Sequence, residues 1–261
     1  MSMTRVRVRR ERPGALAWAV ALAATMLAVY LLTLPAKRKS DSLFASATVT
    51  RALSLEAVDA WCVSLGRRDT PEAARALAAT LADRGAAGVA AELDGAWQAL
   101  GAAYDDRREA ERVAGRIRAE AGLDAAAVRL YAPAVNLRVT APEAQLDDVA
   151  AADALLRGQA AQLGTLARQL DRGETTAEAV RALCAVAASQ VRERARSLRR
   201  WPERDEDRLC APLAGLLETL SGLLDGPVSA GSATTAALSG LLRAARLETL
   251  LRLAAWQGSL G

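Results

Sequence analysis

The sequence predicts an α+β protein built from three parts. A 22-residue uncharged segment at residues 14–35 predicts one transmembrane helix. A motif that occurs twice within residues 53–133 predicts a small βαββαβ domain, because a repeated segment is usually one supersecondary unit. Leucines at helical spacing after residue 142 predict a C-terminal region of about four helices.

The N-terminal part predicts a membrane anchor. Residues 1–13 form a basic tail with five arginines, and residues 36–52 form a polar linker. A cleaved signal peptide would carry a small-residue cleavage site directly after its apolar core, and no such site precedes the basic cluster at residues 37–39. The excess of basic residues before residues 14–35 places the N-terminus in the cytoplasm and the body outside it. We therefore expect a protein anchored in the cytoplasmic membrane with its body outside the cytoplasm.

The repeated motif defines the predicted domain at residues 53–133. Its first copy reads Trp61-Cys62-Val63-Ser64-Leu65-Gly66 and its second reads Trp97-Gln98-Ala99-Leu100-Gly101. Each copy is followed by a helical pattern and then by an apolar stretch of strand length. Two strand–helix–strand units predict a ferredoxin-like sheet with two helices on one face.

Helix boundaries in this domain carry the expected capping residues. Thr70 followed by Pro71 predicts a helix start, and Gly85 predicts a left-handed C-terminal cap. In the second unit Asp105 or Asp106 predicts the start and Gly122 the end.

Residues 134–261 predict a strand or connector followed by a helical bundle. The alternation at residues 135–140 is typical of a short strand. Four apolar helical faces follow, and Gly226-Pro227 is expected to end the third. The faces are marked by Val149, Leu156, Leu163 and Leu170; by Val180, Cys184, Ala187, Val191 and Leu198; by Leu213, Leu216, Leu217, Leu220 and Leu224; and by Leu238, Leu241, Leu242, Ala245, Leu250 and Leu251. They predict a small bundle or two stacked helix hairpins.

The residue inventory predicts a protein that is not an enzyme and that holds no metal or cofactor. The chain has no histidine, no Cys-x-x-Cys pair and no phosphate-binding glycine loop. The acidic pairs at residues 105–106 and 147–148 are expected to cap helices. The three cysteines are expected to be free, buried thiols.

Charge distribution argues against a nucleic-acid partner. Residues 1–40 carry eight basic residues and one acidic residue, so the rest of the chain is at −3 within a formal total of +4. A mildly acidic body lacks the clustered cations that bind phosphate backbones. The five arginines between residues 192 and 200 are interpreted as a solvated helix face rather than as a patch for acidic lipid or wall polymer.

At the repeat, the chain resembles the SPOR (sporulation-related repeat) family of bacterial peptidoglycan-binding domains. The resemblance covers residues 53–133 and rests on the two Trp motifs, together with Tyr104 and the helix starts at Ala73 and Glu109-Ala110. The arrangement of basic tail, single span and outward domain is similar to SPOR membrane proteins of spore-forming Firmicutes. Two positions depart from the family pattern: Ser64 replaces a glutamine, and Arg67-Arg68 replaces a polar-aromatic pair.

The resemblance implies binding of denuded glycan strands at sites of cell division or sporulation. In that family the groove lies across the sheet face opposite the helices. If Val63 and Leu65 point to the core, alternation sends Cys62, Ser64 and Gly66 to that face. The candidate glycan-binding residues are Trp61, Ser64, Arg67, Trp97, Gln98 and Tyr104. Either tryptophan could stack on sugar or belong to the core or its rim.

A second interpretation is a non-enzymatic assembly or scaffold component. In that case the ferredoxin-like domain and the helical tail would contact other proteins. The short linker at residues 36–52, which lacks heptads, is unlike the long coiled coils usual in such proteins. In either interpretation the C-terminal helices are candidates for contact with a protein partner.

Overall fold

The computed structural model describes residues 48–82, 84–201 and 209–260, which all belong to one compact unit. The predicted basic tail at residues 1–13, the predicted transmembrane helix at 14–35 and the linker as far as residue 47 lie outside these residues. None of the helices within the described ranges has the length and apolar character needed to span a membrane.

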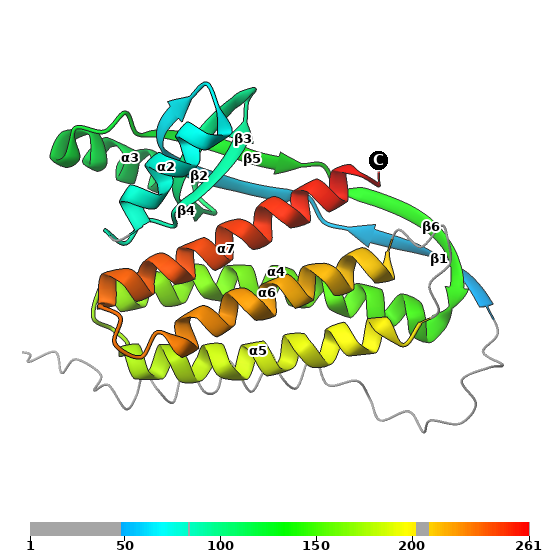
Figure 1. Ribbon diagram of the computed structural model, residues 1–261. Helices are drawn as coiled ribbons and strands as arrows, with labels where there is room; N and C mark the ends of the chain where they lie inside the picture. The colour runs from blue at the N-terminus through cyan, green and yellow to red at the C-terminus, as the bar shows by residue number, and fades with distance from the viewer. Residues whose placement is uncertain (1–47, 83, 202–208, 261) are drawn as a thin grey trace, which may run out of the picture. The chain divides into compact units, whose positions relative to one another are not determined.

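The described chain contains six strands and six helices. In order they are β1 (Thr48–Leu55), β2 (Val58–Arg68), α2 (Pro71–Ala82), β3 (Val89–Leu93), β4 (Ala96–Tyr104), α3 (Arg107–Ala121), β5 (Ala126–Ala132), β6 (Val135–Pro142), α4 (Glu143–Asp171), α5 (Ala177–Arg199), α6 (Cys210–Ser229) and α7 (Thr235–Gly258). The prediction of a mixed α+β chain is confirmed (Figure 1).

Strands β2 to β5 form a four-stranded sheet in the order β3-β4-β2-β5, and every neighbouring pair is antiparallel. Along the chain β2, α2, β3, β4, α3 and β5 follow one another, which is the predicted strand–helix–strand order repeated twice. Helices α2 and α3 both contact the central strands β2 and β4.

The predicted caps of α2 and α3 are present. Thr70 Oγ1 accepts a hydrogen bond of 3.2 Å from the Ala73 amide, and an Asp106 carboxylate oxygen accepts one of 2.8 Å from the Glu109 amide. Gly122 ends α3 in the left-handed region with φ of 64°. Local sequence therefore fixes where these helices begin and where α3 ends.

Strands β1 and β6 form a separate two-stranded antiparallel ribbon. The strand predicted at residues 135–140 is confirmed as part of β6. The prediction that the linker continues to residue 52 is wrong, since β1 begins at Thr48. Paired residues of β1 and β6 lie 80 to 94 positions apart in the chain, so no local pattern reveals the pairing.

The four predicted C-terminal helices are confirmed as α4 to α7. Helix α5 packs on α4 and α6, and α7 packs on α4 and α6. The predicted end of the third helix at Gly226-Pro227 is wrong, because α6 continues to Ser229. Pro227 is buried in the last turn, and Ser229 Oγ donates a hydrogen bond of 2.8 Å to the Asp225 carbonyl. This packing outweighs the lost backbone donor of proline.

The arginine run between residues 192 and 200 forms ion pairs from α5 to α4 and α6. Three of its members form ion pairs: Arg192 with Asp225, Arg194 with Asp148 and Arg199 with Glu218. Asp148 lies in the second turn of α4 and also accepts a 2.9 Å hydrogen bond from Trp201 Nε1. The interpretation of the run as a solvated face is wrong for Arg194, whose side chain is 13% exposed, whereas the side chains of Arg192 and Arg199 remain 42% exposed. The pair Asp147-Asp148 does not cap α4, which begins at Glu143.

Candidate functional site

One face of the four-stranded sheet packs against α2 and α3. Val63 and Leu65 of β2 form an apolar core with Leu81 of α2 and with Ala110 and Ala114 of α3. The expectation that Val63 and Leu65 point to a core beneath the two helices is confirmed.

The opposite face is covered by α7. Ala60, Cys62 and Ser64 alternate with Val63 and Leu65, so they point away from α2 and α3, yet they are only 1%, 0% and 1% exposed. Helix α7 contacts all four strands of this sheet, and Figure 1 places it between the sheet and helices α5 and α6. The prediction of an exposed sheet face opposite α2 and α3 is wrong.

The approach of α7 to the sheet domain is close at its first turns. A Cβ atom on Gly240 would lie 2.9 Å from the Ala86 carbonyl oxygen and 3.3 Å from Gly85 Cα. Only glycine leaves room for this contact. The Arg243 guanidinium, one turn later, donates to the Gly85 carbonyl. The C-terminal end of α7 is fixed by Gln257, whose Nε2 donates to the carbonyls of Glu56 and Pro133 at 2.8 and 2.6 Å.

Ser64 and Gln98, the two candidate glycan-binding residues with uncharged polar side chains on the sheet, form hydrogen bonds within the protein. Ser64 Oγ accepts a 3.4 Å hydrogen bond from the Gly66 amide. Gln98 is 2% exposed, and its Nε2 donates to the Leu93 carbonyl at 3.0 Å. Gln98 Oε1 is buried without a hydrogen-bond partner among the described residues. Neither side chain is available to a polysaccharide on this surface.

The two motif tryptophans lie in matching surroundings. Trp61 is half-buried beneath the Arg107 guanidinium, 5.0 Å from the ring centroid, and Trp97 is half-buried beneath Arg75 at 5.9 Å. Each tryptophan therefore stacks with an arginine from the helix of the other repeat. These contacts favour the rim of the core as their setting, with cation–π attraction in place of sugar stacking.

The remaining candidates lie at separate points of the sheet. Tyr104 is half-buried opposite Trp61 in the β2–β4 register. Arg67 is exposed at the end of β2, opposite Gln98. The structure thus brings the six residues together as cross-strand neighbours on β2 and β4, but on no single accessible face.

Arg246 dominates the electrostatics beneath α7. It is 2% exposed, donates to the Asp105 carboxylate, and has Nε and Nη1 unsatisfied among the described residues. Burial lowers the pKa of Arg246, which the neighbouring Asp105 partly opposes. Burial raises the pKa of Cys62 to about 12, against the charge of Arg246. The Cys62 thiol is therefore protonated and unreactive at neutral pH.

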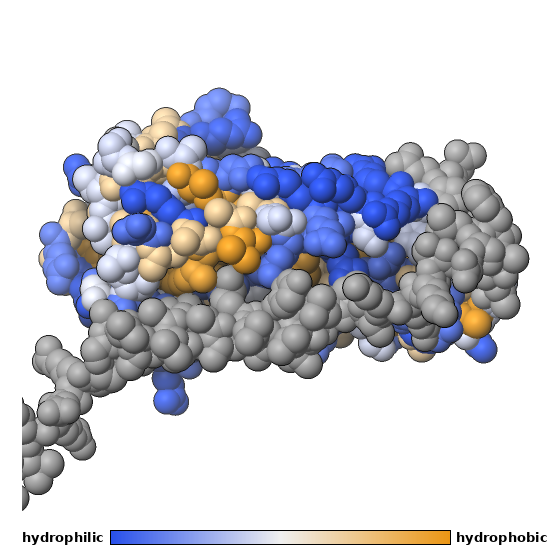
Figure 2. All heavy atoms as spheres, turned by 90° about the horizontal axis from the view of Figure 1, so that it is seen from below, coloured by the Kyte–Doolittle hydropathy of each residue, from blue (hydrophilic) through white to orange (hydrophobic). Residues whose placement is uncertain are grey.

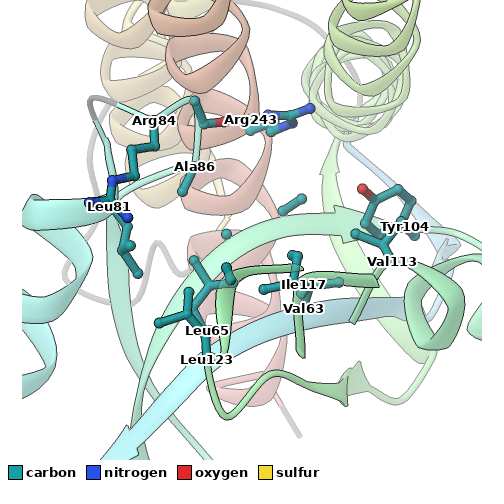
Figure 3. Close-up of a pocket in the computed structure, with 14 residues that line it drawn as sticks. Val63, Leu65, Leu81, Arg84, Ala86, Tyr104, Val113, Ile117, Leu123 and Arg243 are labelled. Carbon is teal, nitrogen blue, oxygen red and sulfur yellow. Dashed lines mark hydrogen bonds between the residues drawn. The ribbon is translucent and has the colours of Figure 1, made fainter. Parts of the chain in front are cut away.

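A cavity of about 250 Å³ lies between α2 and α3, on the sheet face that they cover (Figure 3). Its floor includes Val63, Leu65 and Ala102, and Tyr104 and Arg243 are among its lining residues. Sequence reasoning included Tyr104 but missed the cavity. The available signal was the pair of small residues Gly101 and Ala102 in the centre of a strand.

Acidic and cysteine side chains are the candidate metal ligands in the described residues. No group of three or more cysteine, aspartate or glutamate side chains in them is placed to hold a metal ion. Cys62, Cys184 and Cys210 are all free and buried, as expected. The arrangement can bind through apolar contact and through arginine charge.

Comparison with protein-family models, with curated proteins and with solved structures gave no match to this chain.

Proposed function

We propose that this protein is a non-enzymatic, membrane-anchored assembly component that acts through contact with another protein. The observation that carries the proposal is the closure of the sheet by α7, which leaves Ser64 and Gln98 only 1% and 2% exposed. The glycan groove implied by the SPOR resemblance needs an open sheet face, whereas a protein can bind the outer surfaces of the helices. The antiparallel strand order β3-β4-β2-β5 supports a ferredoxin-like domain within this component.

The outer surface of the helices supports protein contact. Figure 2 shows apolar side chains gathered toward one end of the viewed face and hydrophilic ones toward the other. Among large apolar residues, Val186 of α5 is 50% exposed and Leu241 of α7 is 36% exposed. Gathered apolar side chains on a surface are typical of interaction sites.

Peptidoglycan binding at sites of division or sporulation is the second candidate. The observation that favours it is the doubled strand–helix–strand order, in which Trp61 and Trp97 occupy matching places. The partner would be a denuded glycan strand, with the body of the protein outside the cytoplasm.

Co-sedimentation with isolated sacculi separates the two candidates. The full chain, kept in nanodiscs because of its apolar residues 14–35, is mixed with sacculi before and after an amidase removes the stem peptides. The assembly proposal expects no sedimentation above that of empty nanodiscs in either case. Sedimentation that rises on denuded glycan would overturn it in favour of peptidoglycan binding.

A positive test of the assembly function uses photo-crosslinking in cells. A benzophenone amino acid replaces Val186, and a control chain carries it at Tyr131 on β5, which is 53% exposed. We expect one discrete adduct with another protein from position 186 and none from position 131. Equal labelling at both positions would indicate random collision and contradict a specific contact.

A further inference from the structure

The cavity between α2 and α3 is open to solvent on one side. Its volume is about 250 Å³. An aliphatic cavity of ~150 Å³ accepts benzene, and typical small-molecule sites begin near ~300 Å³. The volume therefore suits a single phenyl ring or a short alkyl chain.

The walls of this cavity are apolar. Val63 and Leu65 rise from the floor, Leu81 closes the α2 side, and Val113 and Ile117 close the α3 side (Figure 3). A Cβ atom on Gly101 would lie 2.9 Å from Leu65 Cδ1, so the glycine lets the Leu65 side chain lie across the strand. Burying an apolar group among these side chains removes it from water and from competing polar contacts.

The mouth of the cavity is positively charged. Arg84 is exposed, and its side chain has no hydrogen bond or ion pair with any described residue. Arg243 is held by the Gly85 carbonyl and the Asp171 carboxylate. In Figure 3 Arg84 lies on the Leu81 side, Arg243 lies above the floor, and Tyr104 lies on the opposite side. Among the described residues near the rim, the three arginines Arg84, Arg168 and Arg243 outnumber the two carboxylates of Glu109 and Asp171, so the net charge is positive and favours an anion.

We propose that this cavity binds an amphiphilic monocarboxylate, with its apolar body between α2 and α3 and its carboxylate at the rim beside Arg84 and Arg243. The observations that carry this assignment are the apolar walls, the volume and an Arg84 side chain that no described residue pairs. Since Arg243 is already held in place by two partners, it offers a fixed charge, and Arg84 is the adjustable one. The assignment does not depend on the proposed assembly function.

The test uses 3-phenylpropanoate as the probe, measured by saturation-transfer NMR and titration calorimetry. The full chain is held in nanodiscs, and empty nanodiscs provide the background. We expect a dissociation constant of about 1 mM or lower, as a ligand of this size allows. The neutral 3-phenylpropan-1-ol should bind about tenfold more weakly, and the cationic 3-phenylpropylamine should not bind measurably above background.

Two variants locate the binding site. Arg84→Gln should weaken binding of the acid about tenfold and leave binding of the alcohol unchanged, since only a charge at the rim is lost. Arg138→Gln, which removes an exposed arginine on β6, is the matched control and should bind as the wild type does. Ala102→Leu places a larger side chain on the cavity floor and should abolish binding of both probes.

Three outcomes would overturn the proposal. Equal binding of acid and alcohol, or unchanged binding of the acid in Arg84→Gln, would exclude recognition of the carboxylate. No binding of either probe to the wild type would mean that the cavity is only a packing defect. If Ala102→Leu fails to fold, Arg84→Gln still decides, because Arg84 is exposed and makes no contact that the fold requires.

Discussion

Gly164 of α4 tests whether α7 is held where the structure places it. A Cβ atom on Gly164 would lie 1.8 Å from Arg246 Nη1 and 2.7 Å from its Cζ, so Gly164→Ala must displace the guanidinium. Replacing glycine in a helix interior normally stabilises by ~1 kcal/mol. Here the displacement breaks the contact with Asp105 and leaves a buried charge, which costs ~3–5 kcal/mol when both partners are buried. Asp105 is 70% exposed, so we take the lower end.

The expected net effect of Gly164→Ala is a loss of about 2 kcal/mol in the free energy of unfolding. In an Arg246→Met background the guanidinium is absent and methionine is flexible, so the same substitution should gain up to about 1 kcal/mol. The coupling free energy is then about 3 kcal/mol, the upper end for residues in contact. Urea unfolding of the four proteins, with linear extrapolation to water, measures it.

Gly158→Ala is the control for helix propensity. Gly158 lies in the same helix and is exposed, and a Cβ atom there would have no neighbouring atom within 4 Å. The substitution should gain about 1 kcal/mol in both backgrounds. If Gly164→Ala behaves like Gly158→Ala in the wild type, Arg246 does not lie against α4, and the placement of α7 against α4 is contradicted.

Three further predictions test the two faces of the sheet and the fixing of α7. Ala102→Val adds methyl groups to the cavity and should raise the urea midpoint or leave it unchanged. Ala103 points to the α7 face and is 5% exposed, so Ala103→Val should lower the free energy of unfolding by about 1–3 kcal/mol. Equal effects of the two substitutions would contradict this assignment of the two sheet faces. Because burial raises the pKa of Cys62 from 9.0 to about 12, its contribution to stability is complete below pH 9 and is lost as the pH rises toward 12. Over that window Cys62→Ala should show a pH slope shallower than the wild type by up to ~1.4 kcal/mol per pH unit, and identical slopes would mean that the thiol is accessible. Gln257→Leu leaves two backbone carbonyls without their donor and should lower the free energy of unfolding by about 2–4 kcal/mol. The control Gln190→Leu on α5, measured by the same urea titration, should change it by less than ~0.5 kcal/mol. A similar loss in both variants would show that the hydrogen bonds of Gln257 have no special role.

The parts of the fold that could be predicted are those whose signals are local. The caps at Thr70, Asp106 and Gly122 and the apolar periodicity of α4 to α7 depend on residues within a few turns of one another. The repeat itself indicates the strand–helix–strand order. Strand β1 escapes prediction because β6, its strand partner within the described ranges, follows the whole domain.

The candidate site could be predicted only in part, because alternation gives the side of a strand and not what covers it. Ser64 does point away from Val63 and Leu65, as period two requires. Its burial results from α7, which lies more than 170 residues later in the chain. One signal was present: α7 has buried residues on more than one side, including Gly240, Ala245 and Leu247, and a helix apolar on several sides is buried between layers.

Closure by α7 has an energetic consequence for any ligand of the covered face. Arg246 contacts both Asp105, which follows β4, and the backbone at Gly164 of α4. Gln257 links α7 to Glu56, between β1 and β2, and to Pro133, between β5 and β6. Separating α7 from the sheet therefore also unpacks the bundle. The free energy required approaches that of global unfolding, ~5–15 kcal/mol for a domain, and a ligand shifts the equilibrium only by its differential affinity for the open form. A glycan that binds with micromolar affinity gains about 8 kcal/mol, and the free energy required to open the face would offset most of that gain. Peptidoglycan binding by this chain would thus require a surface other than the face that holds Ser64 and Cys62.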